Sequence, residues 1–384
     1  MMSPSNAAAW LTAKSTNPLE VKEAPYTSPR SGEIVIRNRA VAINPVDWGK
    51  QLVGNLILSY IKYPFIPGCD VAGEVVELGP DTSRFRVGDR VLGSAIGGAI
   101  EANRAAEGAF QRYTVLREHL ACPMPEAMSY EQACVMPVGA MTAAHGLFHR
   151  DFLNLDFPTV PPRPNPTGRA VIITAGASSV GSNAIQLAVA AGYEVYSTCS
   201  AKNSDYVRGL GATRVFDYRR ANWADEMARE LRGKPVAGAY TIGDGAAEAC
   251  TQILRRLSRA NGTKGKNLVS TSIANAGSIP PADQLKSSIG MAKFMSSAIF
   301  SLGRTAVTSA FTGIKPKFIE VDGLPKPDCV VGRVYTEFLP QALATKQFVP
   351  APDAQVVGKG LEKVQEAMDI QAKGVSARKV VVSL

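Results

Sequence analysis

AVIITAGASSVGSNAIQLAVAAG, residues 170–192, is the stretch that decides the fold. It begins as a short apolar strand (170–174), passes through a turn of small residues and continues as an apolar helical pattern. Small side chains let a phosphate group approach the backbone, and the helix N-terminus offers amide donors and the positive end of a dipole. We therefore predict a dinucleotide pyrophosphate site at Gly176, Ala177, Ser178, Ser179, Val180 and Gly181.

This turn matches the GxGxxG dinucleotide pattern imperfectly, because Ser178 and Ser179 stand where glycine is more usual. An ordinary tight turn between strand and helix is the alternative interpretation. A Walker A loop is excluded, since Gly181 is followed by Ser-Asn and not by Lys-Ser.

Strands and helices alternate from Arg169 onward. Further short strands are predicted at 194–199, 213–216, 237–241 and 267–271, with apolar helical stretches between them. Alternating βα units with buried strands predict an α/β fold, a doubly wound parallel sheet covered on both faces. A Pro-rich connector at 151–168 is expected on the surface.

The N-terminal part has a different pattern. Strands are predicted at 33–43, 71–78 and 87–92, separated by glycines, which is typical of an irregular β domain. No helix–strand alternation is predicted before about residue 130, where a helix-like stretch (130–149) begins. The tail, from Gly332, returns to a helix, a short strand and a final VVVSL.

The composition limits the class of protein. A length of 384 residues predicts about two domains. The net charge of +9 is spread along the chain without a run of five basic residues, so we expect no nucleic-acid partner. Lys293 and several serines interrupt the apolar stretch at 287–302, and no signal peptide is recognisable, so no membrane partner is expected. The six cysteines form no CxxC pair, which favours reduced thiols in a cytoplasmic protein.

The end of the second strand of the alternating region indicates the cofactor. An Asp or Glu there would accept a hydrogen bond from the ribose 2′-hydroxyl of NAD. The sequence has instead Ser200 and Lys202, a hydroxyl and a cation that suit the 2′-phosphate of NADPH. Tyr218, after the third strand, is predicted to pack beside the same phosphate. The alternatives are a solvated surface lysine and a partly buried strand-end aromatic.

Several segments together resemble the medium-chain dehydrogenase/reductase superfamily. They are NPVDWGKQ (44–51), YPFIPGCDVAGEVVELG (63–79), FRVGDRVLG (85–93), GAFQRYTVL (108–116), MPVGAMTAAHGL (136–147) and GLEKVQEAMDIQAKGVSARKVVVSL (360–384). The resemblance spans nearly the whole chain in the family's order. It implies a GroES-like catalytic domain at 1–137 with 333–384, and a Rossmann NADPH-binding domain at 138–332.

Within this superfamily the chain looks like the zinc-free branch. Zinc-dependent members have Cys where this chain has Asn44, His-Glu where it has Cys69-Asp70, and Cys near Val138. They also have a four-cysteine lobe in the region of 95–108, which contains no cysteine here. No third ligand accompanies Cys69 and Asp70, so no metal is expected. The histidines are assigned to the surface or the core (His119, His145 and His149).

The resemblance is closest to fungal trans-acting enoyl reductases of polyketide pathways. The matching pieces are the CSAKN turn, the FDYR strand end, the VYTEFLPQALA helix and an insertion at 280–330, most of which related quinone reductases share. It implies hydride transfer from NADPH to the activated C=C of an enoyl thioester or enone, in secondary metabolism and with a polyketide synthase as partner. Two alternatives stay open: a quinone or enone oxidoreductase of free small molecules, and an NADPH-binding scaffold without turnover. The polar residues of the expected cleft argue against the scaffold.

The resemblance also implies the residues of an interdomain cleft. Asp47, Trp48, Gly49 and Lys50 are expected on one wall and 138–144 on the other. Lys50 is predicted to polarise the substrate oxygen or bind the nicotinamide ribose, and Thr142 to place a hydroxyl near the nicotinamide. The alternatives are a surface charge for Lys50 and a helix-start cap for Thr142. Tyr60 is a weaker candidate for the acid that protonates the substrate, and water is the alternative proton donor. The remaining assignments are Val138, Gly139, Ala140, Met141 and Ala143 to the substrate and Val269 and Ser270 to the cofactor.

The insertion at about 283–330 is rich in Phe, Met, Ile and Ser. We expect it to line the outer cleft and to hold an apolar acyl chain, with Met291 and Met295 as substrate contacts. A helix docked on the sheet or at a dimer edge is the alternative, and a monomer and a dimer both stay open.

Overall fold

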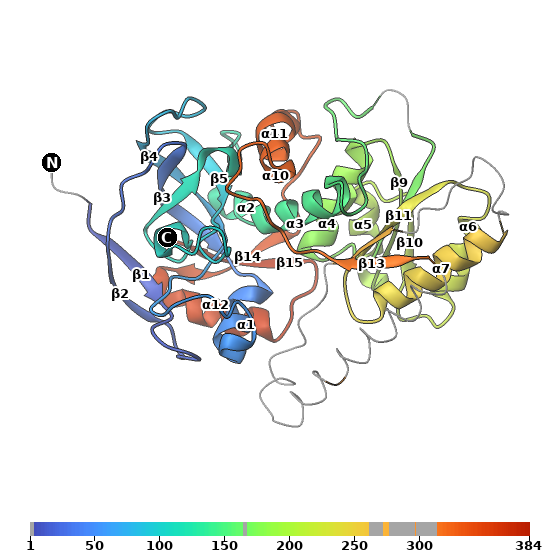
Figure 1. Ribbon diagram of the computed structural model, residues 1–384, viewed down its shortest axis with the longest axis horizontal. Helices are drawn as coiled ribbons and strands as arrows, with labels where there is room; N and C mark the ends of the chain where they lie inside the picture. Colours follow the sequence, from blue (N-terminus) through green and yellow to red (C-terminus); the bar gives the residue numbers. More distant parts are fainter. Residues whose placement is uncertain (1–3, 164–166, 261–271, 276–295, 297–312) are drawn as a thin grey trace. The chain divides into compact units, whose positions relative to one another are not determined.

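The computed structural model describes residues 4–163, 167–260, 272–275, 296 and 313–384 (Figure 1). The chain forms two compact units. The described residues up to Val138 and from Asp322 onward make the first unit, and those from Gly139 to Val321 make the second. The chain thus returns to the first unit at Asp322, ahead of the expected Arg333.

The second unit contains a six-stranded sheet in the order β10-β9-β8-β11-β12-β13, and every pairing in it is parallel. This arrangement confirms the predicted α/β fold. The strand predicted at 267–271 lies outside the described residues, and β13 was not predicted. The strands are β8 (Ala170–Ile173), β9 (Glu194–Cys199), β10 (Arg214–Asp217), β11 (Val236–Thr241), β12 (Ser272–Asn275) and β13 (Lys315–Phe318).

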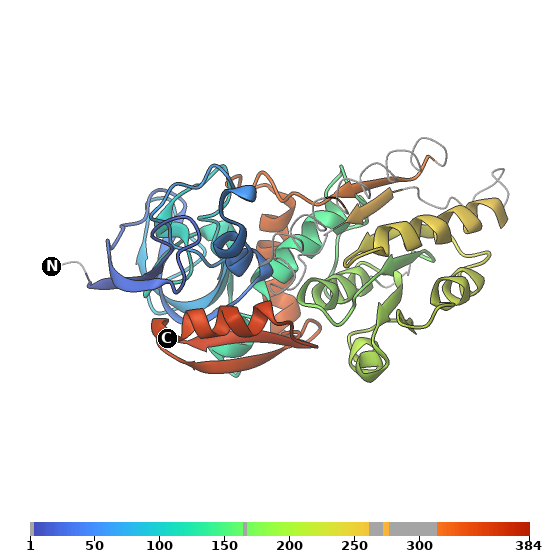
Figure 2. The ribbon, with the colours of Figure 1, turned by 90° about the horizontal axis from the view of Figure 1, so that it is seen from below.

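Helices cover this sheet because their apolar residues recur on one face. In α7, coloured yellow in Figure 2, the buried Cys250, Ile253, Leu254 and Leu257 follow the spacing i, i+3, i+4, i+7. They pack in one cluster with β-strand residues such as Ile172. The helices are α4 (Ser179–Ala190), α5 (Ser204–Gly209), α6 (Trp223–Glu230), α7 (Ala246–Ala260) and α3 (Pro137–Phe148), which begins in the first unit.

The first unit is built on a seven-stranded sheet in the order β14-β15-β3-β4-β5-β7, with β6 also paired to β3. Only β14 and β15 pair in parallel. The predicted β-rich domain is confirmed, and a hairpin of β1 (Asn6–Trp10) and β2 (Glu20–Ala24) was not predicted. The sheet strands are β3 (Glu33–Ala42), β4 (Asp70–Leu78), β5 (Arg90–Ser94), β6 (Tyr113–Arg117), β7 (Ala121–Pro123), β14 (Asp353–Lys359) and β15 (Arg378–Ser383).

Helices also occur in this unit, and the sequence analysis did not predict the one at the start, α1. α1 (Pro45–Val53) begins after Asn44, whose extended backbone suits a cap, and Pro45 occupies the first turn. The carboxylate of Asp47 accepts a hydrogen bond from the Asn44 N–H at 2.7 Å. The other segments are α2 (Tyr130–Ala133), α10 (Val330–Arg333), a π-helical turn (Val334–Phe338), α11 (Leu339–Ala344) and α12 (Val364–Ala372).

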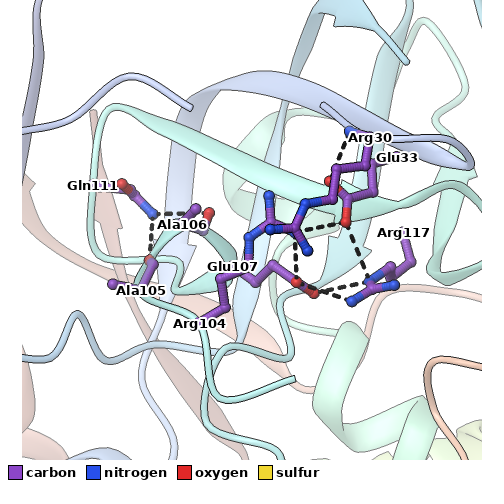
Figure 3. A network of polar contacts seen from close by, with 8 residues as sticks. All are labelled: Arg30, Glu33, Arg104, Ala105, Ala106, Glu107, Gln111 and Arg117. Atoms are coloured by element: carbon purple, nitrogen blue, oxygen red, sulfur yellow. Dashed lines mark hydrogen bonds and ion pairs between the residues drawn. The ribbon is translucent and has the colours of Figure 1, made fainter. Parts of the chain in front are cut away.

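Buried ion pairs hold the 95–108 region, where the sequence has no cysteine (Figure 3). Arg104 Nη1 lies 2.6 Å from Glu33 Oε1 and 3.1 Å from Glu107 Oε1. Arg117 Nε lies 3.0 Å from Glu107 Oε2. Both carboxylate side chains are 1% exposed, so the two arginines supply the charge that such burial requires.

No helix among the described residues is long and apolar enough to cross a membrane. The six cysteines are free thiols in the structure.

Candidate functional site

The predicted phosphate-binding turn joins β8 to α4, where the strand order of the parallel sheet reverses. β9 and β10 lie on one side of β8, and β11, β12 and β13 lie on the other. Doubly wound sheets bind ligands beyond the carboxyl ends of their strands at such a switch point. The residues from Ala177 to Val180 are partly exposed, whereas Gly176 and Gly181 are buried. The turn is therefore partly accessible at the N-terminus of α4.

Two glycines make this turn tight. A Cβ on Gly176 would lie 2.3 Å from Ser197 Oγ, and a Cβ on Gly181 would lie 2.3 Å from the Ala175 carbonyl oxygen. Neither position has room for a side chain, so α4 begins close against the end of β8. Ser178 is the N-cap of α4, and its Oγ accepts a hydrogen bond from Gly181 N at 3.0 Å. The predicted cofactor ligand Ser178 thus shapes the turn.

The carboxyl end of β9 is tied to this turn. Ala175 N donates to Thr198 Oγ1 at 3.1 Å, and Gly176 N donates to the Thr198 carbonyl at 2.8 Å. Ser200 follows with 8% exposure, and Lys202 lies exposed on a single 3₁₀ turn, Ala201–Asn203. The structure therefore brings the predicted pyrophosphate turn and the predicted 2′-phosphate residues to one edge of the sheet.

A carboxylate that the sequence analysis missed also lies at this edge. Asp217, the last residue of β10, is opposite Cys199 in the register of β10 and β9. Its Oδ1 accepts from Arg219 N at 3.1 Å and from Arg219 Nε at 3.3 Å. Chiefly the backbone hydrogen bond from Arg219, and also its guanidinium, keep the pKa of Asp217 below the ordinary value. The strand-end position in FDYRR was the available signal, because parallel pairing aligns the ends of neighbouring strands.

Tyr218, the other predicted phosphate neighbour, follows Asp217 directly. Its ring is accessible, with the residue 53% exposed, and its backbone N donates to the Cys199 carbonyl at 3.4 Å. This exposure is compatible with both interpretations, a phosphate neighbour and a partly buried strand-end aromatic, so the role of Tyr218 stays a prediction.

The predicted residues of α1 are buried: Asp47, Trp48, Gly49 and Lys50. Trp48 Nε1 donates to Gln371 Oε1 within the same unit. Burial raises the pKa of Asp47 to about 7, against an opposing hydrogen bond from Asn44 N. These side chains are held by contacts inside the first unit.

Lys50 illustrates this best. The residue is 2% exposed, so the alternative of a surface charge is wrong. Its Nζ lies 2.9 Å from the Leu58 carbonyl and 3.1 Å from the Ile57 carbonyl, with Gly54 O and Asn55 Oδ1 each at 3.2 Å. Burial lowers the pKa of this ammonium. Its donors hold the loop after α1, and a direct role with the substrate stays a prediction.

The predicted substrate segment forms the first half of α3. A Cβ on Gly139 would lie 2.7 Å from Ser179 Oγ, so α3 packs directly against the start of α4. Met141 and Thr142 are partly exposed, whereas Ala140 and Ala143 are buried. Thr142 lies in the middle of α3, so the alternative of a helix-start cap is wrong.

Tyr60, the weaker acid candidate, is half-buried, and its hydroxyl donates to the Gly98 carbonyl at 2.7 Å. Four further predicted residues lie outside the described residues: Val269, Ser270, Met291 and Met295.

At the positions that correspond to zinc ligands, Asp70 forms hydrogen bonds with Asn44 and Val138 and an ion pair with Lys379. Asp70 Oδ1 accepts from Val138 N at 2.6 Å, and Oδ2 accepts from Asn44 Nδ2 at 2.8 Å and lies 2.7 Å from Lys379 Nζ. Burial raises the pKa of the adjacent Cys69 thiol, which disfavours a thiolate ligand. Among the described residues no group of three or more His, Cys, Asp or Glu is placed to hold a metal. This donor set does not fit a zinc ion, and the sequence analysis missed Lys379.

Comparisons with known proteins agree with the fold. Residues 30–126 match the family described as Alcohol dehydrogenase GroES-like domain. The chain is 46% identical to dehydrogenase pigH of Monascus ruber over 99% of this chain and 100% of that protein. It is 35% identical to trans-enoyl reductase himH of Aspergillus japonicus over 100% of this chain and 99% of that protein. The crystal structure of CurK enoyl reductase has a TM-score of 0.67 at 20% identity, with 98% of this chain and 99% of that chain covered.

The second unit has a parallel sheet with a glycine-containing turn between β8 and α4, and the first unit is rich in β-strands. This combination is typical of two-unit nicotinamide-dependent oxidoreductases. The chain belongs to the medium-chain dehydrogenase/reductase superfamily, and its relatives include fungal trans-enoyl reductases. Membership implies a nicotinamide dinucleotide as cofactor. The residues fit such a group, because small, partly exposed residues of the turn at Gly176–Gly181 lie at a helix N-terminus.

Proposed function

We propose that this chain is a zinc-independent, NADPH-dependent reductase that delivers a hydride to the activated C=C of an enoyl thioester or enone. The observation that carries the proposal is the Asp70–Lys379 ion pair, since an ammonium occupies the carboxylate that a metal would need. Without zinc, alcohol oxidation loses the Lewis acid that would polarise its oxygen. Reduction of a conjugated C=C can instead use a hydrogen-bond donor to the developing enolate oxygen.

NADPH preference is supported by cations at the neighbouring ends of β9 and β10. Lys202 is exposed after β9, and Arg219 follows the end of β10, where it pairs with Asp217. A 2′-phosphate carries about two negative charges, so paired cations favour it over a hydroxyl. Ser200 and Tyr218 complete the proposed subsite.

The chain's own residues have two proposed tasks, binding the pyrophosphate and stabilising the enolate oxygen. The N-terminus of α4 binds the pyrophosphate through its amide groups. The bound nicotinamide supplies the hydride. The Thr142 hydroxyl would donate a hydrogen bond to the developing enolate oxygen. Thr142 lies on α3, which packs directly against the start of α4. Because Tyr60 already donates to Gly98 O, we propose that water supplies the proton to the α carbon.

A trans-acting role with a polyketide synthase is part of the proposal. Its support is the full-length similarity to himH, a protein named as a trans-enoyl reductase. Such an enzyme takes its substrate from a carrier protein, so the acyl chain arrives as a thioester.

The test is NADPH oxidation measured side by side with enoyl thioesters, carrier-bound enoyl chains, free enones and quinones. The proposal expects the thioesters to be reduced with the highest kcat/KM. Faster reduction of quinones would favour the quinone oxidoreductase alternative. NADPH binding without turnover on any of these substrates would favour a scaffold.

A further inference from the structure

One peptide group at the start of α3 is held from both sides by buried side chains. The Pro137 carbonyl accepts a hydrogen bond from Tyr335 Oη at 2.8 Å, and Val138 N donates to Asp70 Oδ1 at 2.6 Å. Tyr335 comes from the π-helical turn and Asp70 from β4, and both are 0% exposed. The amide and the carbonyl belong to the same peptide, so its orientation is fixed.

The carboxylate in this arrangement depends on a distant lysine. Lys379, from β15, places Nζ 2.7 Å from Asp70 Oδ2 and 2.5 Å from Asn44 Oδ1. Asn44 Nδ2 in turn donates to Asp70 Oδ2 at 2.8 Å. Asn44 is the N-cap of α1, so one triangle of polar groups links β4, β15, the start of α1 and the start of α3.

The burial of Lys379 indicates that its main role is the ion pair with Asp70. Lys379 is 4% exposed and precedes three fully buried valines of β15, whereas the neighbouring Arg378 is exposed. A lysine is almost never buried unless it is paired. Its only charge partner among the described residues within ion-pair distance is Asp70, whose own burial is complete.

We infer that Lys379 is a positioning residue, whose buried ammonium holds Asp70 so that the Pro137–Val138 peptide and the Asn44 cap fix the starts of α3 and α1. This inference rests on the proposed function, because α3 carries Thr142, the residue proposed to contact the substrate. The ammonium links the same positions that zinc ligands occupy in the zinc-dependent members. An ion pair therefore gives the rigidity that metal–ligand bonds would give.

Three variants test the inference. Lys379→Met removes the cation and leaves the Asp70 carboxylate buried without its charge partner. The double variant Lys379→Met with Asp70→Asn removes both charges, while the amide oxygen of the new side chain still accepts from Val138 N. Arg378→Met is the matched control, because Arg378 lies on the same strand and forms an exposed ion pair with Asp353.

Hydrogen exchange at the Val138 amide is the readout that does not depend on activity. We expect Lys379→Met to speed this exchange by roughly tenfold or more, through local opening at the start of α3. The double variant should return exchange to near the rate of the natural chain, and Arg378→Met should not change it. An unchanged Val138 exchange in Lys379→Met overturns the inference, and so does a double variant that exchanges as fast as the single one.

Kinetics with an enoyl thioester supply the second readout. Lys379→Met should lower kcat by about ten- to a hundredfold, the cost of a small misplacement of reacting groups. Its Kd for NADPH should stay within about threefold, because the phosphate-binding turn shares no partner with Lys379. Faster Val138 exchange with an unchanged kcat overturns the positioning role. If the natural chain reduces no enoyl substrate, the proposed function fails, while exchange at Val138 still decides whether Lys379 holds the peptide.

Discussion

Arg219 and Asp217 form a closed pair at the end of β10, in which both the backbone N–H and Nε of Arg219 donate to Asp217 Oδ1. A carboxylate at this edge of a nucleotide-binding sheet would otherwise favour the ribose hydroxyls of NADH. Because Arg219 pairs with this carboxylate, the positive charge of Lys202 is not offset at this edge of the sheet.

The first prediction concerns cofactor preference. Lys202→Ala and Arg219→Ala should each weaken NADPH binding by about ten- to a hundredfold, the loss of one charge-assisted contact worth roughly 1.5–3 kcal/mol. NADH binding should be unchanged in Lys202→Ala and tighter in Arg219→Ala, because Asp217 becomes free. Fluorescence titration with both cofactors measures this, and Arg214→Ala, in an exposed ion pair at the start of β10, is the control. A natural chain that binds NADH as tightly as NADPH would contradict it.

The second prediction concerns metal. Protein purified in the presence of a chelator should keep its full reductase activity, since Asp70 is already occupied by three N–H donors. Elemental analysis accompanies the assay. Stoichiometric zinc that is lost together with activity would falsify zinc independence.

The third prediction distinguishes a catalytic from a structural role of Lys50. Lys50→Met leaves the acceptors of the 54–58 loop without their donor, so we expect the free energy of unfolding to fall by about 1–3 kcal/mol. Urea unfolding monitored by fluorescence measures this loss. A variant with unchanged unfolding and a kcat reduced more than tenfold would instead support the direct role predicted from the resemblance.

Local patterns in the sequence predicted most of the second unit. The turn at Gly176–Gly181 and the strand 194–199 are where they were expected, because both are encoded by adjacent residues. Cap signals for α1 were also present in Asn44 and Pro45, yet Gly49 in its middle weakened the helical pattern.

The site network in the first unit was beyond sequence reasoning for a physical reason. Asn44, Asp70 and Lys379 are separated by up to hundreds of residues, and only the pairing of β3 with β4 and β15 brings them together. Spacing along a chain carries no information on such contacts. The lysine embedded before VVV was the one local irregularity that pointed to a buried partner.

The network in Figure 3 predicts acid sensitivity. Burial acts to raise the pKa of Glu33, but hydrogen bonds from Arg104 and Arg30 outweigh it and set that pKa below its ordinary value of 4.5. The folded pKa is therefore below the unfolded one, and the stability that Glu33 contributes is lost as the pH falls below about 4.5.

Glu107→Gln should remove part of that network at neutral pH. It leaves Arg104 and Arg117 with one carboxylate between them, and breaking such a buried pair costs about 3–5 kcal/mol. Thermal unfolding at pH 7 and pH 4 measures the change, with Glu230→Gln, from an exposed pair, as control. Equal unfolding temperatures for Glu107→Gln and the natural chain would show that the ion pairs contribute nothing net.

Asp47 predicts the opposite pH dependence. Burial raises its folded pKa to about 7 from the ordinary 3.8, so the neutral carboxyl is the form that the fold prefers. The stability that Asp47 contributes is fully present below about pH 4 and is lost as the pH rises to about 7, at roughly 1.4 kcal/mol for each step of one in pH. Asp47→Asn keeps a side-chain oxygen for the Asn44 N–H without an ionisable group. We expect this variant to be less sensitive to pH than the natural chain between about pH 4 and 7, the range in which the carboxyl is ionised in the unfolded chain and still protonated in the fold. Urea unfolding across that range measures the difference, and parallel pH curves for the two proteins would contradict the raised pKa of Asp47.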